Sequence, residues 1–88
     1  MATESLDEFP EDERARIFIA VNLREARKVE DILGERDVDY AVNIEPYYRI
    51  SPFQTEHQGV AFYVKSEDAD ISRRILKQRG LATGVVDI

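Results

Sequence analysis

The pattern of apolar and polar positions predicts strand, helix and strand in the first half of the folded chain. Residues 16–23 alternate between apolar and other side chains, which is typical of a strand with one face on a core. A helix is expected to follow as far as about Arg36, because apolar residues recur on one stripe and charged residues cover the rest. Asn22 and Glu25 suit the N-cap and capping-box positions of that helix. Residues 40–45 alternate again and predict the second strand.

The second half of the chain repeats this order at an offset of 43 residues. Residues 60–65 predict a third strand, and Ser66 is a suitable N-cap for a second helix. Gly80 suits the C′ position after that helix, and residues 84–88 predict a short last strand. The offset pairs Ile17 with Val60, Ala26 with Ala69, Ile32 with Ile75, Leu33 with Leu76, Val38 with Leu81 and Val42 with Val85.

Two strand-helix-strand units in tandem predict the α+β class and the ferredoxin-like plan, βαββαβ. In this two-layer sandwich, two helices cover one face of a four-stranded antiparallel sheet. The side chains expected on the covered face are Ile17, Ile19, Val21, Val60, Phe62 and Val64. Phe18 and Tyr63 are expected on the open face, where an exposed apolar patch usually marks an interface. Self-association through this face is therefore predicted, against the alternative of a solvated sheet.

The charge of the chain is unevenly distributed. The 88 residues carry a formal net charge of −6, and the first 13 residues contain six acidic and no basic residues. We therefore expect residues 1–13 to be an acidic disordered tail and residues 14–88 to be one ferredoxin-like domain. The alternative is a partner-docking arm, in which Phe9 packs back on the domain.

Composition restricts the cellular setting. With no Cys there is no disulfide framework and no thiolate zinc site. The first residues lack the basic and apolar regions of a secretory signal, and no apolar run approaches the ~18 residues that span a bilayer. We expect a soluble cytoplasmic protein without membrane association.

The segment 45–58 is longer than the two to five residues that a hairpin turn needs, and it is rich in aromatic residues. It is interpreted in three ways: an extension of the strands that covers one end of the core, a contact with a partner or second subunit, or the wall of a small-ligand pocket. In the last case Arg49 at the rim would favour an anionic ligand. The candidate contact residues are Tyr47, Tyr48, Arg49, Phe53 and His57.

Catalytic and metal chemistry find little support in the sequence. His57 is the single histidine, and no second nitrogen or sulfur ligand stands at a metal-binding spacing from it. The glycines are dispersed and spell no phosphate-binding loop. We therefore expect no enzyme activity, no metal and no cofactor. A small hydrolase or isomerase that uses His57 is the enzymatic alternative.

Single-stranded RNA binding is the other alternative, because RNA-recognition domains share this fold. Residues 58–65, QGVAFYVK, resemble the third-strand ribonucleoprotein motif. However, Gln58 replaces the basic residue, Val60 replaces the first stacking aromatic residue, and Phe62 is expected to face the core. The folded part is also formally neutral, whereas phosphate binding depends on Lys and Arg. Nucleic acid is therefore an unfavoured partner.

The first half resembles a family of small bacterial proteins described as signal-transducing domains of unknown function, which have PII-like regulators as distant relatives. The resemblance lies in Glu25 and Ala26 at the helix start, the stripe Val29, Ile32 and Leu33, and residues 38–42 entering the next strand. It implies a non-enzymatic regulatory or protein-binding role, with a protein partner or a homo-oligomer, and transfers no ligand residue. The acidic tail and the aromatic hairpin depart from the family pattern.

Overall fold

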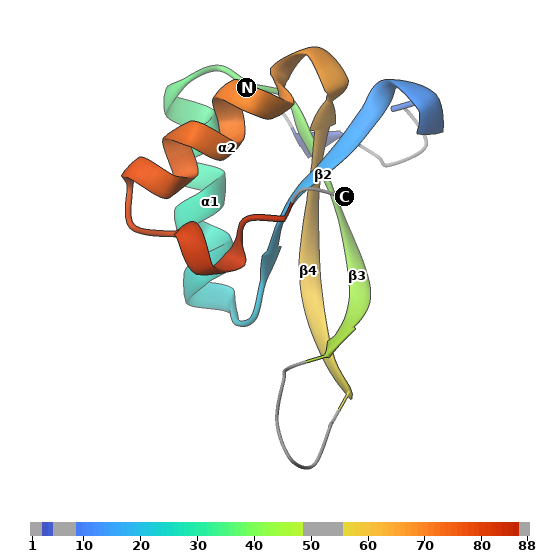
Figure 1. Cartoon of the computed structure of the whole chain (residues 1–88), viewed down its shortest axis with the longest axis vertical. Helices are drawn as coiled ribbons and strands as arrows, with labels where there is room; N and C mark the ends of the chain where they lie inside the picture. Colours follow the sequence, from blue (N-terminus) through green and yellow to red (C-terminus); the bar gives the residue numbers. More distant parts are fainter. Residues whose placement is uncertain (1–2, 5–8, 49–55, 87–88) are drawn as a thin grey trace.

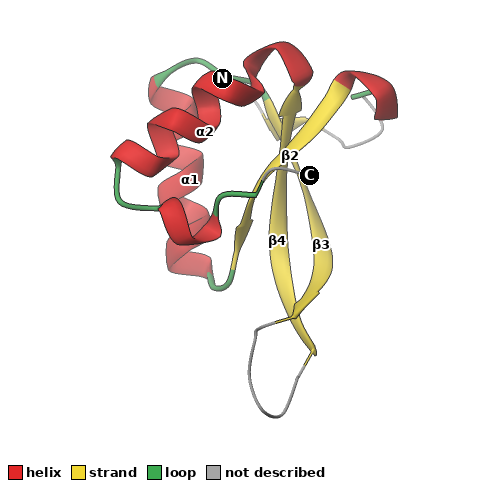
Figure 2. Ribbon diagram, viewed as in Figure 1, coloured by secondary structure: helices red, strands yellow, loops and turns green. Residues whose placement is uncertain are grey.

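The computed structural model describes residues 3–4, 9–48 and 56–86. Within these residues, two α-helices lie on one side of a sheet of three long antiparallel strands (Figure 1, Figure 2). The long elements are β2 (Arg14–Ala20), α1 (Leu23–Glu35), β3 (Tyr40–Tyr48), β4 (Glu56–Lys65) and α2 (Ala69–Gln78). The predicted α+β class is confirmed, as is the placement of both helices on the same face.

The sheet has the order β1-β3-β4-β2, and β4 pairs in antiparallel fashion with both β3 and β2. The short strand β1 (Thr3–Glu4) pairs in parallel with Tyr40 and Ala41 at the start of β3. The predicted last strand is not confirmed. Within the described residues the chain beside β2 forms a 3-10 helix, Ala82–Gly84, and one isolated antiparallel bridge joins Phe18 to Val85.

The two helices begin differently. Asn22 caps α1 as predicted, because its side-chain oxygen accepts a hydrogen bond of 2.8 Å from the backbone N–H of Glu25. The Glu25 carboxylate in turn accepts one of 3.2 Å from the backbone N–H of Val21. The prediction for Ser66 is wrong: residues Ser66–Asp68 form a 3-10 turn, and α2 begins after it without a side-chain cap.

The two helices end alike. Gly80 has a φ of 86°, as the predicted C′ glycine requires, and the N–H of Leu81 bonds to the carbonyl of Leu76 at 3.0 Å. The N–H of Val38 makes the same bond to the carbonyl of Leu33, also at 3.0 Å. Asp37, at the position equivalent to Gly80, has a φ of 59°.

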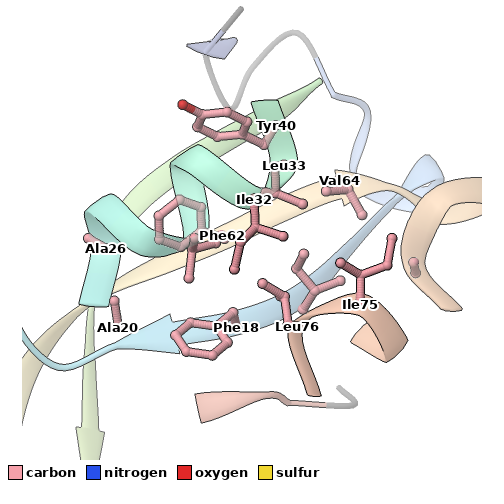
Figure 3. Packing of buried hydrophobic residues seen from close by; sticks show 13 residues of the cluster. Phe18, Ala20, Ala26, Ile32, Leu33, Tyr40, Phe62, Val64, Ile75 and Leu76 are labelled. Carbon is pink, nitrogen blue, oxygen red and sulfur yellow. The ribbon is translucent and has the colours of Figure 1, made fainter. Parts of the chain in front are cut away.

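The core lies between the helices and the sheet (Figure 3). Ile32 and Ile75 belong to the same buried cluster, as the repeat predicts. Phe62 and Val64 also belong to it and Val60 packs against it, so the predicted orientation of β4 is confirmed. The cluster consists of Ile17, Phe18, Ala20, Ala26, Val29, Ile32, Leu33, Tyr40, Phe62, Val64, Ala69, Ile75 and Leu76.

The predicted orientation of Phe18 is wrong. Its side chain is fully buried in the core, although strict alternation places it on the open face. The cause is an irregularity in β2, where Arg16 pairs with Tyr63 but Phe18 pairs with Phe62. Between these two pairs β2 advances by two residues while β4 advances by one, as in a β-bulge. The alternation of side chains between the two faces of β2 therefore reverses after Ile17. Ile17 and Phe18 are both buried, and Ile19 is turned toward the open face, opposite Ala61.

Arg73 of α2 holds the last described residues against the bulged strand. Its Nη2 donates to the carbonyl of Arg16 at 3.0 Å, and its Nε donates to the carbonyl of Val86 at 2.8 Å. The N–H of Val86 donates to the carbonyl of Ile17 at 2.9 Å. The backbone hydrogen-bonding groups at the outer edge of β2 are therefore satisfied partly by the Arg73 side chain. A complete fourth strand would satisfy them with its own backbone.

The described part of the acidic segment is in contact with the domain. Phe9 is only 4% exposed, which matches the packing-back alternative for this residue. Its carbonyl accepts a hydrogen bond of 3.1 Å from Arg14 Nη1. A 3-10 turn, Glu11–Glu13, then leads into β2, and its three acidic residues are exposed.

Candidate interaction surface

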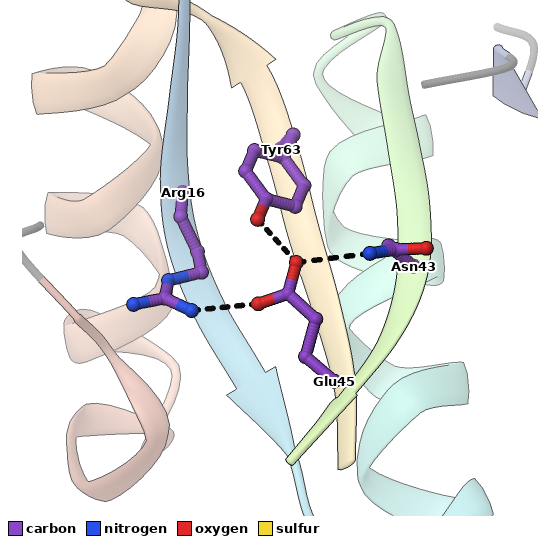
Figure 4. A network of polar contacts seen from close by, with 4 residues as sticks. All are labelled: Arg16, Asn43, Glu45 and Tyr63. Carbon is purple, nitrogen blue, oxygen red and sulfur yellow. Dashed lines mark hydrogen bonds and ion pairs between the residues drawn. The ribbon is translucent and has the colours of Figure 1, made fainter. Parts of the chain in front are cut away.

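The open face of the sheet contains a polar network centred on Glu45 of β3 (Figure 4). Arg16 Nη1 donates to Glu45 Oε1 at 2.6 Å. Asn43 Nδ2 donates to Oε2 at 3.1 Å, and the hydroxyl of Tyr63 donates to the same oxygen. All three long strands therefore contribute to one network on the face opposite the helices. The Glu45 side chain is 14% exposed and the Arg16 side chain 26%, so this ion pair is partly shielded from water.

The network shifts the proton affinity of both acidic groups. Burial by itself would raise the pKa of Glu45, but the hydrogen bonds from Tyr63, Asn43 and Arg16, with the charge of Arg16, lower it below the ordinary value of 4.5. Burial and the hydrogen bond to Glu45 raise the pKa of Tyr63 above 10.0. Both shifts favour the hydrogen-bonded state, with an ionised carboxylate and a neutral phenol.

The open face is therefore not the exposed aromatic patch that the sequence predicts. Phe18 lies in the core, and Tyr63 is half-buried with its hydroxyl engaged. The guanidinium carbon of Arg14 lies 5.2 Å from the centre of the Tyr63 ring. Ala41 and Ala61, which share this face, are fully buried. Of the two residues predicted for this surface, only Tyr63 lies on it.

The long hairpin is a two-stranded extension of the sheet. The pairing of β3 with β4 continues to Tyr47 with His57 and Tyr48 with Glu56, whereas β2 ends opposite Val60. The extension of the strands, which is part of one of the three interpretations, is confirmed for these residues, whereas the predicted covering of the core by the aromatic side chains stays a prediction. The side chains of Tyr47, Tyr48 and His57 lie outside the described part of the structure, and so do Arg49 and Phe53 altogether.

A shallow apolar groove lies at the base of this extension, and we call it the root groove. Its volume is about 190 Å³. One wall is the end of β2 with the turn into α1, and the other belongs to β3 and β4. The groove is lined by Ala20, Val21, Asn22, Leu23, Ile44, Gln58, Gly59 and Val60. Two of the three exposed large apolar side chains in the described residues line it: Leu23, 81% exposed, and Ile44, 64% exposed.

Sequence reasoning did not identify the root groove or the Glu45 network. Ile44 shares the strand face of Tyr40 and Val42, so alternation predicts that it faces the helices. It is nevertheless 64% exposed, at the level where β2 ends, since Ile44 pairs with Val60 and Val60 pairs with Ala20, the last residue of β2. The unusual length of segment 45–58 was the available signal, since extended strands must leave part of their inner face uncovered. Glu45 carried no comparable signal, because one acidic residue at a strand end is ordinary.

Other chemical sites are sparse in the described residues. A second hollow, of about 360 Å³, lies between the acidic 3-10 turn Glu11–Glu13 and the turn Ser66–Asp68. Within the described ranges, no group of three or more His, Asp or Glu residues is arranged to hold a metal ion. None of the helices in those ranges is long and apolar enough to span a membrane.

Comparisons with protein-family models, with curated proteins and with solved structures found no match to this chain.

Proposed function

We propose that this chain is a non-enzymatic, regulatory protein-binding module of the cytoplasm that associates with itself. The surface we assign to this role is the projecting β3–β4 extension together with its base. The open face around Phe18, which the sequence predicts as part of this surface, is not included, because Phe18 is buried in the core. The resemblance of the first half to signal-transducing domains fits a regulatory role, in which binding rather than chemistry is the output.

The observation that carries the proposal is the unpaired outer edge of β3. The strand β1 covers only Tyr40 and Ala41, so from Val42 to Tyr48 the edge pairs with no strand in the described residues. Such an edge can add a strand from another chain through backbone hydrogen bonds. Pro46 has no backbone N–H, so it interrupts the row of hydrogen-bond donors along β3. This limits indiscriminate pairing of the edge with strands of other proteins. Exposed Ile44 next to this edge adds apolar area that association would bury.

We further propose that the chain follows the ferredoxin-like plan with a shortened last strand. The bridge between Phe18 and Val85 supports this, because it lies where a fourth strand would pair with β2. The offset between the two halves also aligns Val85 with Val42 of β3.

Light scattering on the full chain over a wide concentration range tests self-association. We expect the mean mass to rise with concentration toward at least twice the 10.1 kDa of one chain. Ile44→Lys should reduce this rise, whereas Ile71→Lys, at an exposed apolar residue of α2, should not. A mass of one chain at every concentration would exclude self-association.

Single-stranded RNA binding is the second candidate, because the open face combines Tyr63 with basic side chains. Arg16 pairs with Tyr63 across the strands, and Arg14 pairs with Lys65. Against it, Tyr63 already bonds Glu45 and faces Arg14. A fluorescence titration with single-stranded RNA at low salt discriminates, since phosphate-driven binding must weaken as salt rises. Absence of binding at low salt would remove this candidate.

A further inference from the structure

We infer that the root groove receives the Leu23 side chain of a second copy of this chain, so that two copies form a two-fold symmetric dimer. This inference rests on the proposed self-association and names its contact. Leu23 is the first residue of α1, and its side chain is 81% exposed although it lines an apolar hollow. A single exposed leucine is common on protein surfaces, so the case depends on its surroundings.

The first argument is charge. All eight residues that line the root groove are uncharged, whereas 34% of the residues of the chain are charged. The formal net charge of −6 is carried by the acidic residues 1–13, whereas residues 14–88 are formally neutral but carry many charges of both signs. In a two-fold symmetric contact each charge near the axis would face its own copy, so an uncharged surface avoids like-charge repulsion. Depletion of charged residues at the centre of a surface is also the compositional mark of protein interfaces.

The second argument is shape. The same small surface has a projecting apolar side chain, Leu23, and a hollow whose lining includes buried Ala20 and Gly59, with little or no side chain of their own. A two-fold axis beside the groove would place each leucine in the hollow of the other copy. Interfaces of symmetric dimers are built in this self-complementary way, with residue i contacting residue j in both directions.

The third argument is size. At about 190 Å³ the groove is smaller than the ~300–1,000 Å³ typical of small-molecule sites. It is therefore better suited to one apolar side chain than to a metabolite. Burial of Leu23 and the neighbouring Ile44 would also cover two of the three exposed large apolar side chains of the described residues.

The test compares Leu23→Glu with Ile71→Glu by sedimentation velocity across a concentration series. Both residues are exposed and lie in the first turn of a helix, where a glutamate suits the helix dipole, so both variants should fold. Circular dichroism verifies this. We expect Leu23→Glu to raise the dimer dissociation constant by about 100-fold or more, because each dimer loses two buried leucines. Ile71→Glu should leave the constant unchanged within about threefold.

A second measurement locates the contact, and the absence of native cysteine makes it simple. Arg24→Cys, at an exposed residue beside the groove that does not line it, carries a nitroxide on a copy without isotopes, and this copy is mixed with wild-type chains labelled with ¹³C at leucine methyl groups. Any broadening is then intermolecular. We expect the methyl signals of Leu23 to broaden and to recover when the nitroxide is reduced.

The outcomes separate this inference from the proposed function. A wild-type chain that is monomeric at every concentration overturns both. If the wild-type chain associates and Leu23→Glu associates equally well, or if the Leu23 methyl signals stay sharp, the groove contact is wrong while self-association stands. Loss of association in Leu23→Glu alone, with broadened Leu23 signals, supports the dimer through the groove.

Discussion

The two halves of this chain share a hydrophobic pattern but differ in how the hydrogen bonds of their backbones are satisfied. The first half, residues 14–48, ends in the nine-residue strand β3, and its helix has a complete N-terminal cap at Asn22. The second half, residues 56–86, ends in a 3-10 turn and one bridge, and α2 has no side-chain cap. In the second half, the guanidinium of Arg73 donates to backbone carbonyls that lie outside its own helix.

The comparison teaches that a repeated apolar pattern preserves helix placement without preserving the hydrogen bonds around it. Ile32 and Ile75 occupy one core, and the bonds at the helix ends, Val38 to Leu33 and Leu81 to Leu76, are equivalent. The final strands, by contrast, have diverged. The stability of the second half should therefore depend on a few specific residues, which mutation can identify.

The largest effect is expected at Gly84, where the end of the second half meets the core of the first. A Cβ on this residue would overlap the ring of Phe18, which is fully buried. Gly84→Ala should lower the free energy of unfolding by about 3 kcal/mol through this overpacking. Urea denaturation measures the loss. Thr83→Ala, at an exposed residue of the same turn, is the control and should change little. Equal stability of the two variants would show that the C-terminal turn is not packed on Phe18.

Arg73→Met should have the next largest effect. The substitution keeps an apolar stem but leaves the carbonyls of Arg16 and Val86 without their guanidinium donors. We expect a loss of about 2 kcal/mol in the free energy of unfolding. Amide exchange at Val86, whose N–H bonds to Ile17, should also accelerate. Arg74→Met, at an exposed neighbour, is the control. Unchanged exchange at Val86 would contradict the role of Arg73 in holding the end of the second half.

The bond between Glu45 and Tyr63 joins the two halves across the open face, and it makes stability depend on pH. Because the folded state lowers the pKa of Glu45, its contribution is present above 4.5 and is lost as pH falls through the lower folded value. Because the folded state raises the pKa of Tyr63, that contribution is present below 10.0 and is lost as pH rises through the higher folded value.

Glu45→Gln should therefore cost about 1.5 kcal/mol at pH 7 and reduce the loss of stability on acidification. Tyr63→Phe should instead reduce the loss at alkaline pH. Thermal unfolding from pH 3 to pH 11 measures both. An identical pH profile for Glu45→Gln and the wild-type chain would mean that the carboxylate contributes nothing to stability.

The sequence predicted the parts of this fold that depend on periodicity. Helix placement, the orientation of Phe62 and the caps at Asn22 and Gly80 follow from local chemistry, and the structure confirms them. The bulge at Ile17 could not be predicted, because residues 16–20 alternate equally well in a regular strand. Because of that single extra residue, the Phe18 side chain points into the core and not toward the open face, where regular alternation places it.

The candidate surface was only partly predictable for a related reason. The length of segment 45–58 indicated that a feature projects there, and the pairing of β3 with β4 confirms an extension. Where the helix layer stops relative to the strands is a tertiary property, and periodicity does not contain it. The exposure of Leu23 and Ile44, and hence the root groove, became visible only in three dimensions.

A smaller effect, of opposite sign, is expected at Ser72. This residue occupies the position equivalent to Val29 and is fully buried, and its hydroxyl has no hydrogen-bond partner among the described residues. Ser72→Ala should raise the free energy of unfolding by about 1 kcal/mol, because it removes an unsatisfied polar group from the core. Ser66→Ala, at an exposed serine that caps no helix, is the control and should be neutral. Destabilisation by Ser72→Ala would imply that the hydroxyl does find a partner in solution.

The smallest single effect is expected at Asp37, at one of the two equivalent helix ends. Asp37 and Gly80 both have positive φ, which glycine adopts without the steric cost that a Cβ imposes. Asp37→Gly should therefore raise the free energy of unfolding by about 0.5 kcal/mol, even though it removes a side chain. The reverse change, Gly80→Asp, should lower it by about 1 kcal/mol. This cost is conformational, because apart from the adjacent backbone no atom of the described residues lies within 4 Å of the new Cβ. Chemical denaturation of both variants measures the difference. If both changes destabilise equally, then Asp37 contributes contacts that outweigh its backbone cost, and the two helix ends are alike only in geometry.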